Sequence, residues 1–139
     1  MNARSIFKKL AELHLFIENN SLDLLCVTET WLNENIPDSL ICPTGYKVFR
    51  YDRPSHDGGV AIFVRSTVTA HQVSVSTEFK HIEIICIDVN LYGLDYQFTE
   101  SLVFIAHLAY IYLRDSVKCF QHLCSADRLV GDFNLPCVD

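Results

Sequence analysis

The feature that most constrains the fold is a pair of short apolar runs, each of which ends directly in an acidic motif. Residues 22–27 lead into Glu-Thr-Trp-Leu at 29–32, and residues 128–130 lead into Gly-Asp-Phe-Asn-Leu-Pro at 131–136. Short apolar runs between polar residues are typical of buried strands. The sequence therefore predicts an α/β protein in which Glu29 and Asp132 follow strand ends.

An amphipathic helix is predicted ahead of the first run. Four apolar residues fall along one stripe of a helix over residues 5–18, namely Ile6, Leu10, Leu13 and Ile17. Asn-Asn-Ser at 19–21 ends this helix, and the strand at 22–27 follows. Because a helix followed by a buried strand is half of a parallel crossover unit, Glu29 is expected at the carboxyl end of that strand.

The middle of the chain has the pattern of successive strands. Strands are predicted at 46–50, 59–65, 71–76 and 82–89, after a loop marked by Pro37 and by Pro-Thr-Gly at 43–45. In the third of these strands, Val73 and Val75 are expected to point inward. A second helix is predicted at 116–124, and residues 102–113 fit either a buried helix or a strand, of which we favour the helix. The whole pattern indicates a mixed α/β sandwich.

Composition limits the classes of partner. With 50% hydrophobic and 20% charged residues, the chain is expected to form a single domain over residues 1–139. The net charge of −6, with only 11 Lys and Arg residues, leaves no basic excess to attract phosphate backbones. Binding of nucleic acid would therefore have to be local and assisted by a metal ion.

Cysteine usage and hydropathy bear on the compartment. The six cysteines form no Cys-x-x-Cys pair, which argues against a zinc site and favours reduced thiols in an intracellular protein. No segment has the form of a signal peptide, and the longest apolar run, residues 102–113, is shorter than the roughly 20 residues that a bilayer requires. We expect a soluble protein of the nucleus or cytoplasm, without a membrane partner.

The motif residues have the chemistry needed to hydrolyse a phosphodiester. Glu29 is a hard oxygen ligand suited to Mg²⁺, which keeps most of its waters and uses one or two protein carboxylates. Asp132 can orient or deprotonate the attacking water, and Asn134 can donate an amide hydrogen bond to the phosphate. Asn2 can hydrogen-bond the cluster of waters around the metal. We predict one Mg²⁺ site with Glu29 and Asn2 as its ligands and with Asp132, Asn134 and Asn2 as the catalytic group.

Five motifs follow one another along the chain. They are Asn-Ala-Arg-Ser-Ile at 2–6, Glu-Thr-Trp-Leu at 29–32, Gly-Tyr at 45–46 with Tyr-Asp-Arg at 51–53, Gly-Gly-Val-Ala-Ile at 58–62, and Gly-Asp-Phe-Asn-Leu-Pro at 131–136. In order and spacing they resemble the endonuclease/exonuclease/phosphatase superfamily, and within it the endonuclease domain of LINE-type non-LTR retrotransposons. The resemblance implies an incomplete two-sheet α/β sandwich flanked by helices.

The resemblance also implies an activity and partners. Members of that family are Mg²⁺-dependent phosphodiesterases that nick DNA, and the retrotransposon proteins continue into a reverse transcriptase. By motif position, Asn2 and Glu29 correspond to residues on the metal side, while Asp132 and Asn134 correspond to the pair at the water and the phosphate. DNA is therefore the expected partner of an active protein, and the rest of a reverse transcriptase polyprotein is a second expected partner.

The sequence departs from the family pattern in three places, one of which is that Met1 directly precedes the first motif where the family has a strand. The Ser-Asp-His motif that ends the family's site is absent from the printed residues, so we expect these 139 residues alone to be inactive. Relatives carry Val-Tyr-Arg-Pro-Pro where this chain reads Val-Phe-Ile-Ala-His at 103–107. We hypothesise a local frameshift around residues 99–110, which an alternative reading frame encoding Tyr-Arg-Pro-Pro would support.

Other interpretations stay open. A non-catalytic relic or partner-binding fragment is the alternative to an enzyme, and a small-phosphate phosphatase is a third hypothesis. Glu29 also fits a solvated strand-end acid, and Asn134 fits a turn former ahead of Leu-Pro at 135–136. Trp31 is expected to pack under the Glu29 loop.

Overall fold

The computed structural model describes residues 1–54, 57–75, 77, 83–90, 99–105 and 128–130, the last two segments and residue 90 by their backbone alone. These residues form two sheets. The first has the strand order β1-β3-β2, with β1 at Leu24–Thr28, β2 at Tyr46–Tyr51 and β3 at Val60–Arg65, all antiparallel. The second has the order β4-β5-β6-β7, with β4 at Thr69–Val73, β5 at Ile84–Asn90, β6 at Thr99–Ile105 and β7 at Arg128–Val130.

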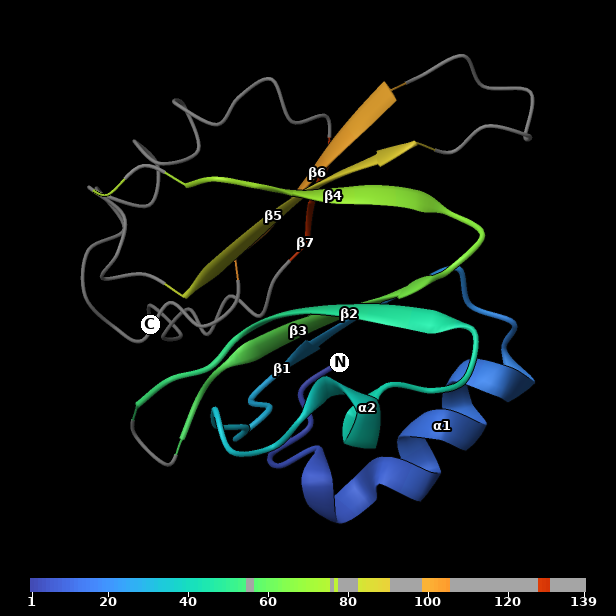
Figure 1. The fold of residues 1–139 in the computed structure, drawn as a ribbon, viewed down its shortest axis with the longest axis vertical. Coiled ribbons are helices and arrows are strands. Elements are labelled where there is room, and N and C mark those ends of the chain that lie inside the picture. Colours follow the sequence, from blue (N-terminus) through green and yellow to red (C-terminus); the bar gives the residue numbers. More distant parts are fainter. Residues whose placement is uncertain (55–56, 76, 78–82, 91–98, 106–127, 131–139) are drawn as a thin grey trace, which may run out of the picture.

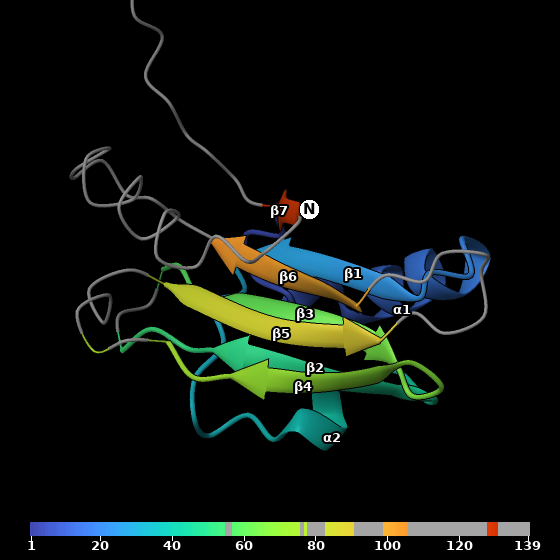
Figure 2. The same cartoon turned by 90° about the horizontal axis from the view of Figure 1, so that it is seen from above.

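The two sheets face one another and helices cover the outer face of the first sheet (Figure 1). The strand β3 lies between β1 and β2 in the first sheet, and it is buried on both faces. Its side chains alternate, so Val60, Ile62 and Val64 pack toward the second sheet while Ala61 and Phe63 pack toward the helical side. Seen from above, β5 lies over β3 in Figure 2, and the residues of β5 in this inter-sheet core are Ile85, Ile87 and Val89.

The predicted N-terminal helix is confirmed, with a later start. A 3₁₀ turn at Phe7–Lys9 leads into α1 at Leu10–Asn19. Helix cannot begin at residue 5 because Arg4 and Ser5 have φ angles of 44° and 83°. The predicted stripe does face the core: Leu13 and Ile17 are fully buried against the first sheet, together with Ile6, and Leu10 packs against them.

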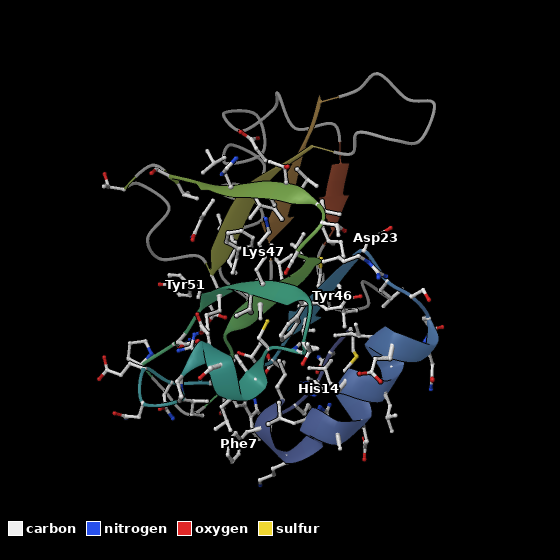
Figure 3. All side chains as sticks on the ribbon, turned by 45° about the vertical axis from the view of Figure 1, so that its right-hand side comes forward. Phe7, His14, Asp23, Tyr46, Lys47 and Tyr51 are labelled. Carbon is white, nitrogen blue, oxygen red and sulfur yellow. The ribbon has the colours of Figure 1, made fainter. Side chains whose placement is uncertain are left out.

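The segment predicted as a loop around Pro37 contains a short helix instead. This helix, α2 at Asp38–Ile41, starts directly after Pro37, whose extended backbone allows a helix to begin at the next residue. His14 ties the two helices together, since its Nε2 lies 3.0 Å from the carbonyl oxygen of Ile41. Figure 3 shows His14 on the side of α1 that faces α2, while Phe7 lies at the exposed end of the molecule.

The first residues of the chain run parallel to β1, beside it. Asn2 forms a parallel β-bridge with Thr28, Ala3 N donates to Thr28 O at 2.9 Å, and Thr28 N donates to Met1 O at 2.8 Å. The chain then passes through α1 and returns into β1, so the predicted helix–strand half of a crossover unit is confirmed. Both Asn2 and the residue after Thr28 therefore lie at the same end of β1.

Two predictions about the second sheet are wrong. Val73 does not point inward, because β4 begins at Thr69 and turns Ala70 toward the core; Val73 is exposed and Val75 lies beyond the strand, half-buried. Residues 102–105, for which we favoured a helix, belong to β6, which pairs with β5 along its whole length. An antiparallel ladder satisfies the backbone of this apolar segment, and β-branched residues suit it.

Some expectations fall outside the described residues, among them the helix at 116–124 and the segment that follows β7. The three-residue strand predicted at 128–130 is confirmed as β7, which is parallel to β6. Within the part of the chain that the structure describes, no helix has both the length and the apolar character needed to cross a membrane.

Candidate functional site

Glu29 follows the last residue of β1, as predicted, and its backbone is unusual. Its φ angle is 56°, and that of Trp31 is 53°, a region that residues other than glycine rarely enter. The residue between them, Thr30, is completely buried, and Glu29 is 9% exposed. Such conformations cost roughly 1–3 kcal/mol each and persist only where the surroundings enforce them, often at functional sites.

One oxygen of the Glu29 carboxylate is held by a neighbouring side chain. The indole Nε1 of Trp31 donates a hydrogen bond of 2.8 Å to Glu29 Oε2. The prediction that Trp31 packs under the Glu29 loop is wrong, because its side chain is 36% exposed. The indole is partly exposed, and its N–H group lies against the carboxylate. Because an ionised carboxylate accepts several hydrogen bonds or metal contacts, the indole donor takes up only part of its capacity.

The backbone of this segment is fastened to the Gly-Gly pair that precedes β3. Thr30 N donates to Gly59 O at 3.2 Å, and Trp31 N donates to Gly58 O at 2.9 Å. Gly58 and Gly59 have φ angles of 92° and 79°. A Cβ on Gly59 would lie 2.6 Å from Thr30 Oγ1, closer than real contacts allow. A larger residue at 59 would therefore displace the loop that carries Glu29.

A buried carboxylate that sequence reasoning missed supports the Gly-Gly pair from the other side. Glu83, only 7% exposed, accepts a hydrogen bond from Gly59 N at 2.8 Å through Oε2. Its Oε1 lies 3.2 Å from Arg53 Nε. The signal in the sequence was an acid directly before the apolar strand β5, but its partners lie more than twenty residues away, in loops. Glu83 and Arg53 thus hold the Gly-Gly pair, to which the backbone of the segment after Glu29 is bonded.

The predicted residue Asn2 is placed at the same end of β1 as Glu29. Its bridge to Thr28 sets it one residue before Glu29, and Ser5 N donates to Glu29 O at 2.9 Å. The side chain of Asn2 is exposed. The structure thus brings the Asn2 and Glu29 motifs together. Asp132 and Asn134 lie outside the described residues, so their roles stay predictions.

The donor set at this end of β1 fits Mg²⁺ better than a transition metal. Among the described residues no group of three or more His, Cys, Asp or Glu side chains could hold a metal ion. Mg²⁺ does not require such a group, because it retains several waters and is bound through one or two carboxylates. An oriented glutamate and an asparagine at the same end of β1 therefore suit it.

Burial shifts the pKa of two groups near the site. Asp52, which follows β2, has its pKa raised by burial, although the nearby Arg50 guanidinium, 3.3 Å from Asp52 Oδ2, opposes this. Burial inside β1 raises the pKa of the Cys26 thiol to about 12, against a smaller opposing effect of the amino terminus of Met1. Cys26 is a free thiol, and at neutral pH it is protonated and behaves as a small apolar residue.

The sequence of the chain matches a known protein family. The sequence pattern of the Endonuclease/Exonuclease/phosphatase family matches residues 2–139. No curated protein sequence matched the chain.

Solved structures share the fold. An AP endonuclease from Archaeoglobus fulgidus matches with a TM-score of 0.57 and 20% identity over 75% of this chain and 38% of its own. The 3′ phosphatase NExo from Neisseria, bound to a product DNA hairpin, matches with a TM-score of 0.62 and 18% identity over 96% of this chain and 56% of its own. The human Nocturnin catalytic domain, with a bound sulfate anion, matches with a TM-score of 0.60 and 14% identity over 95% of this chain and 58% of its own. The chain thus spans between about two fifths and three fifths of the length of these structures.

Proposed function

Because the chain belongs to the endonuclease/exonuclease/phosphatase family, we propose that it carries the metal-binding half of a Mg²⁺-dependent phosphodiesterase site that cleaves DNA. The observation that carries this proposal is the buried Glu29 carboxylate, held by the Trp31 indole at the end of β1 beside the Asn2 motif. Energy is stored in two strained residues to hold this carboxylate in place, which a solvated strand-end acid would not require.

Glu29 and Asn2 would hold the ion, while Asp132 and Asn134 would act on the water and the phosphate. When bound, Mg²⁺ supplies positive charge that offsets the negative charge growing on the phosphate oxygens. Trp31 keeps the Glu29 carboxylate oriented through its N–H group. Asp132 orients the attacking water and takes its proton, and Asn134 donates an amide hydrogen bond to the phosphate. The last two roles rest on motif position.

DNA is the substrate that the comparisons favour. Two of the similar structures are those of an AP endonuclease and of a 3′ phosphatase bound to DNA, which supports a DNA substrate for this chain. The wording of the motifs at 2–6 and 29–32 supports an origin in a LINE-type retrotransposon, whose product would continue into a reverse transcriptase. Genomic sequence on either side of the coding region tests that origin.

The proposal is tested by plasmid nicking in Mg²⁺ with the chain, with Glu29→Gln and with Asp132→Asn. Nicking that both substitutions abolish would support a complete site. If the chain binds Mg²⁺ through Glu29 and does not nick, these residues are the non-catalytic fragment that the sequence led us to expect. Nicking that persists in Glu29→Gln would refute the assignment. Glu18→Gln, on the exposed face of α1, is the matched control for removing one carboxylate charge.

A further inference from the structure

A pocket of about 460 Å³ opens next to Trp31, on the side of the loop that follows Glu29. Two segments line it, the one after Glu29 and the one after β2; the residues are Trp31, Leu32, Asn33, Glu34, Asn35, Asp52, Arg53 and Pro54. We call it the Trp31 pocket. Ligand pockets usually have volumes of roughly 300–1,000 Å³, so its size suits a small planar group rather than a protein segment.

The indole connects this pocket to the candidate metal ligand. Its N–H group is bound to Glu29 Oε2 at 2.8 Å, while the ring itself lines the pocket and is partly exposed. The hydrogen bond fixes the position of the ring before any ligand arrives. Fixing an aromatic ring in advance lowers the entropy that binding must overcome.

The charges around the pocket disfavour a phosphate within it. One cation, Arg53, is already paired with Glu83 at 3.2 Å, and Asp52 is paired with Arg50. The pocket also has Glu34 in its lining, so acids outnumber bases there. The polar lining is completed by Asn33 and Asn35, whose loop is ordered by a hydrogen bond of 3.0 Å from Asn35 N to Asn33 Oδ1. These groups suit an uncharged aromatic ring with hydrogen-bonding edges.

We propose that the Trp31 pocket binds an unpaired nucleobase, stacked on Trp31, from a nucleic-acid strand whose neighbouring phosphate lies at Glu29. This proposal rests on the function proposed above, because the phosphate is placed by the metal ion that Glu29 would hold and the base by the indole bound to Glu29. A base that is paired and stacked within a duplex cannot place its face on Trp31. The site therefore prefers single-stranded or extrahelical nucleotides, and stacking makes it tolerant of base identity.

The chain offers a direct probe because Trp31 is its single tryptophan. The emission of Trp31 is measured in Ca²⁺ while oligothymidylate is added, and again with a strand of the same length and charge built of abasic sites. Saturable quenching by oligothymidylate and none by the abasic strand is the expected result. Equal responses to both strands, or no response to either, would overturn the proposal. Thymidine monophosphate that quenches at the same concentration as the strand would overturn its assignment to a strand.

Variants separate stacking from orientation of Glu29, with affinity measured by the anisotropy of a labelled oligothymidylate. Trp31→Ala should weaken binding by roughly 5- to 150-fold, the range that loss of one base-stacking aromatic produces. Trp31→Phe retains a ring but loses the bond to Glu29, so it should bind less tightly than the parent and more tightly than Trp31→Ala. Phe16→Ala removes an exposed aromatic from α1 and should not change the affinity. Equal affinities for Trp31→Ala and Phe16→Ala, with circular dichroism showing both folded, would contradict the proposal.

Failure of this inference is distinguishable from failure of the proposed function. Glu29-dependent nicking without base-dependent quenching would refute the Trp31 pocket as a base site and leave the metal site standing. Base-dependent quenching with nicking that ignores Glu29→Gln would support the pocket and refute the phosphodiesterase assignment. The quenching titration of the unsubstituted chain decides the matter even if Trp31→Ala does not fold.

Discussion

Replacing Gly59 with alanine should destabilise the protein through one named contact, the approach of residue 59 to Thr30. The added Cβ would lie 2.6 Å from Thr30 Oγ1 and 3.3 Å from the carbonyl oxygen of Tyr51, at a φ angle of 79°. The left-handed backbone costs an alanine about 1–2 kcal/mol. Overpacking against buried atoms adds about 1–3 kcal/mol. We therefore expect Gly59→Ala to lower the free energy of unfolding by about 2–5 kcal/mol.

Gly45→Ala is the matched control for the backbone contribution. Gly45 has a φ angle of 81°, close to that of Gly59, but no atom lies within 4 Å of its added Cβ. This variant should lose only about 1–2 kcal/mol. Urea unfolding followed by circular dichroism gives both values, and their difference isolates the clash.

Thr30→Ala provides the rescue. Thr30 Oγ1 is buried and has no hydrogen-bond partner among the described residues, so its removal sacrifices no bond there. In the double variant Thr30→Ala/Gly59→Ala the atom that Cβ meets first is gone, and about 1–3 kcal/mol should be recovered relative to additivity. Equal losses for Gly59→Ala and Gly45→Ala, or a double variant that is merely additive, would refute the claim that the Gly-Gly pair must approach Thr30 closely.

Three further predictions concern the same region. Glu83→Ala should lower the free energy of unfolding in urea by about 1–3 kcal/mol, since it leaves the buried Gly59 N–H without its acceptor. Asp23→Ala breaks the exposed pair with Arg65 and should lower it by only about 0–1 kcal/mol. Equal losses would contradict the claim that Glu83 supports the Gly-Gly pair. Burial raises the pKa of Cys26 to about 12, so as the pH rises above 9.0 the thiol ionises in the unfolded chain before it ionises in the folded protein. The free energy of unfolding of the parent, relative to that of Cys26→Ala, should therefore be constant below pH 9.0 and fall by about 1.4 kcal/mol per pH unit above it. A difference in urea unfolding that does not change with pH would show that Cys26 is not buried as described. Trp31→Phe keeps an aromatic ring, although a smaller one, and removes the donor to Glu29 Oε2, so it should weaken Mn²⁺ binding by roughly 10-fold or more in calorimetry. Unchanged binding would show that the indole does not orient Glu29.

The parts of the fold that depend on local pattern were predictable from the sequence. The stripe Ile6, Leu13 and Ile17 on the first helix and the delivery of Glu29 by β1 both follow from spacing within one segment. The family resemblance added the two-sheet sandwich, which the family match and the solved structures bear out.

The failures depend on partners distant in sequence. The inward face of β4 is set by pairing of Ala70 with Val89, and a valine-rich pattern alone assigned the wrong face. The strand β6 forms because β5 offers it a complete ladder, although its composition also fits a helix. The positive φ angles of Glu29 and Trp31 occur at residue types that do not predict them, and Glu83 binds Gly59 from a segment 24 residues further along the chain, just before β5.

The most direct test of the central claim is the binding of a divalent metal at Glu29. Mn²⁺, which has the same preference for oxygen ligands, is titrated into the full chain by isothermal calorimetry and electron paramagnetic resonance. We expect a Mn²⁺ site that Mg²⁺ displaces, that Glu29→Gln abolishes and that Glu18→Gln leaves unchanged. Binding of equal affinity in Glu29→Gln and in the parent would contradict the account.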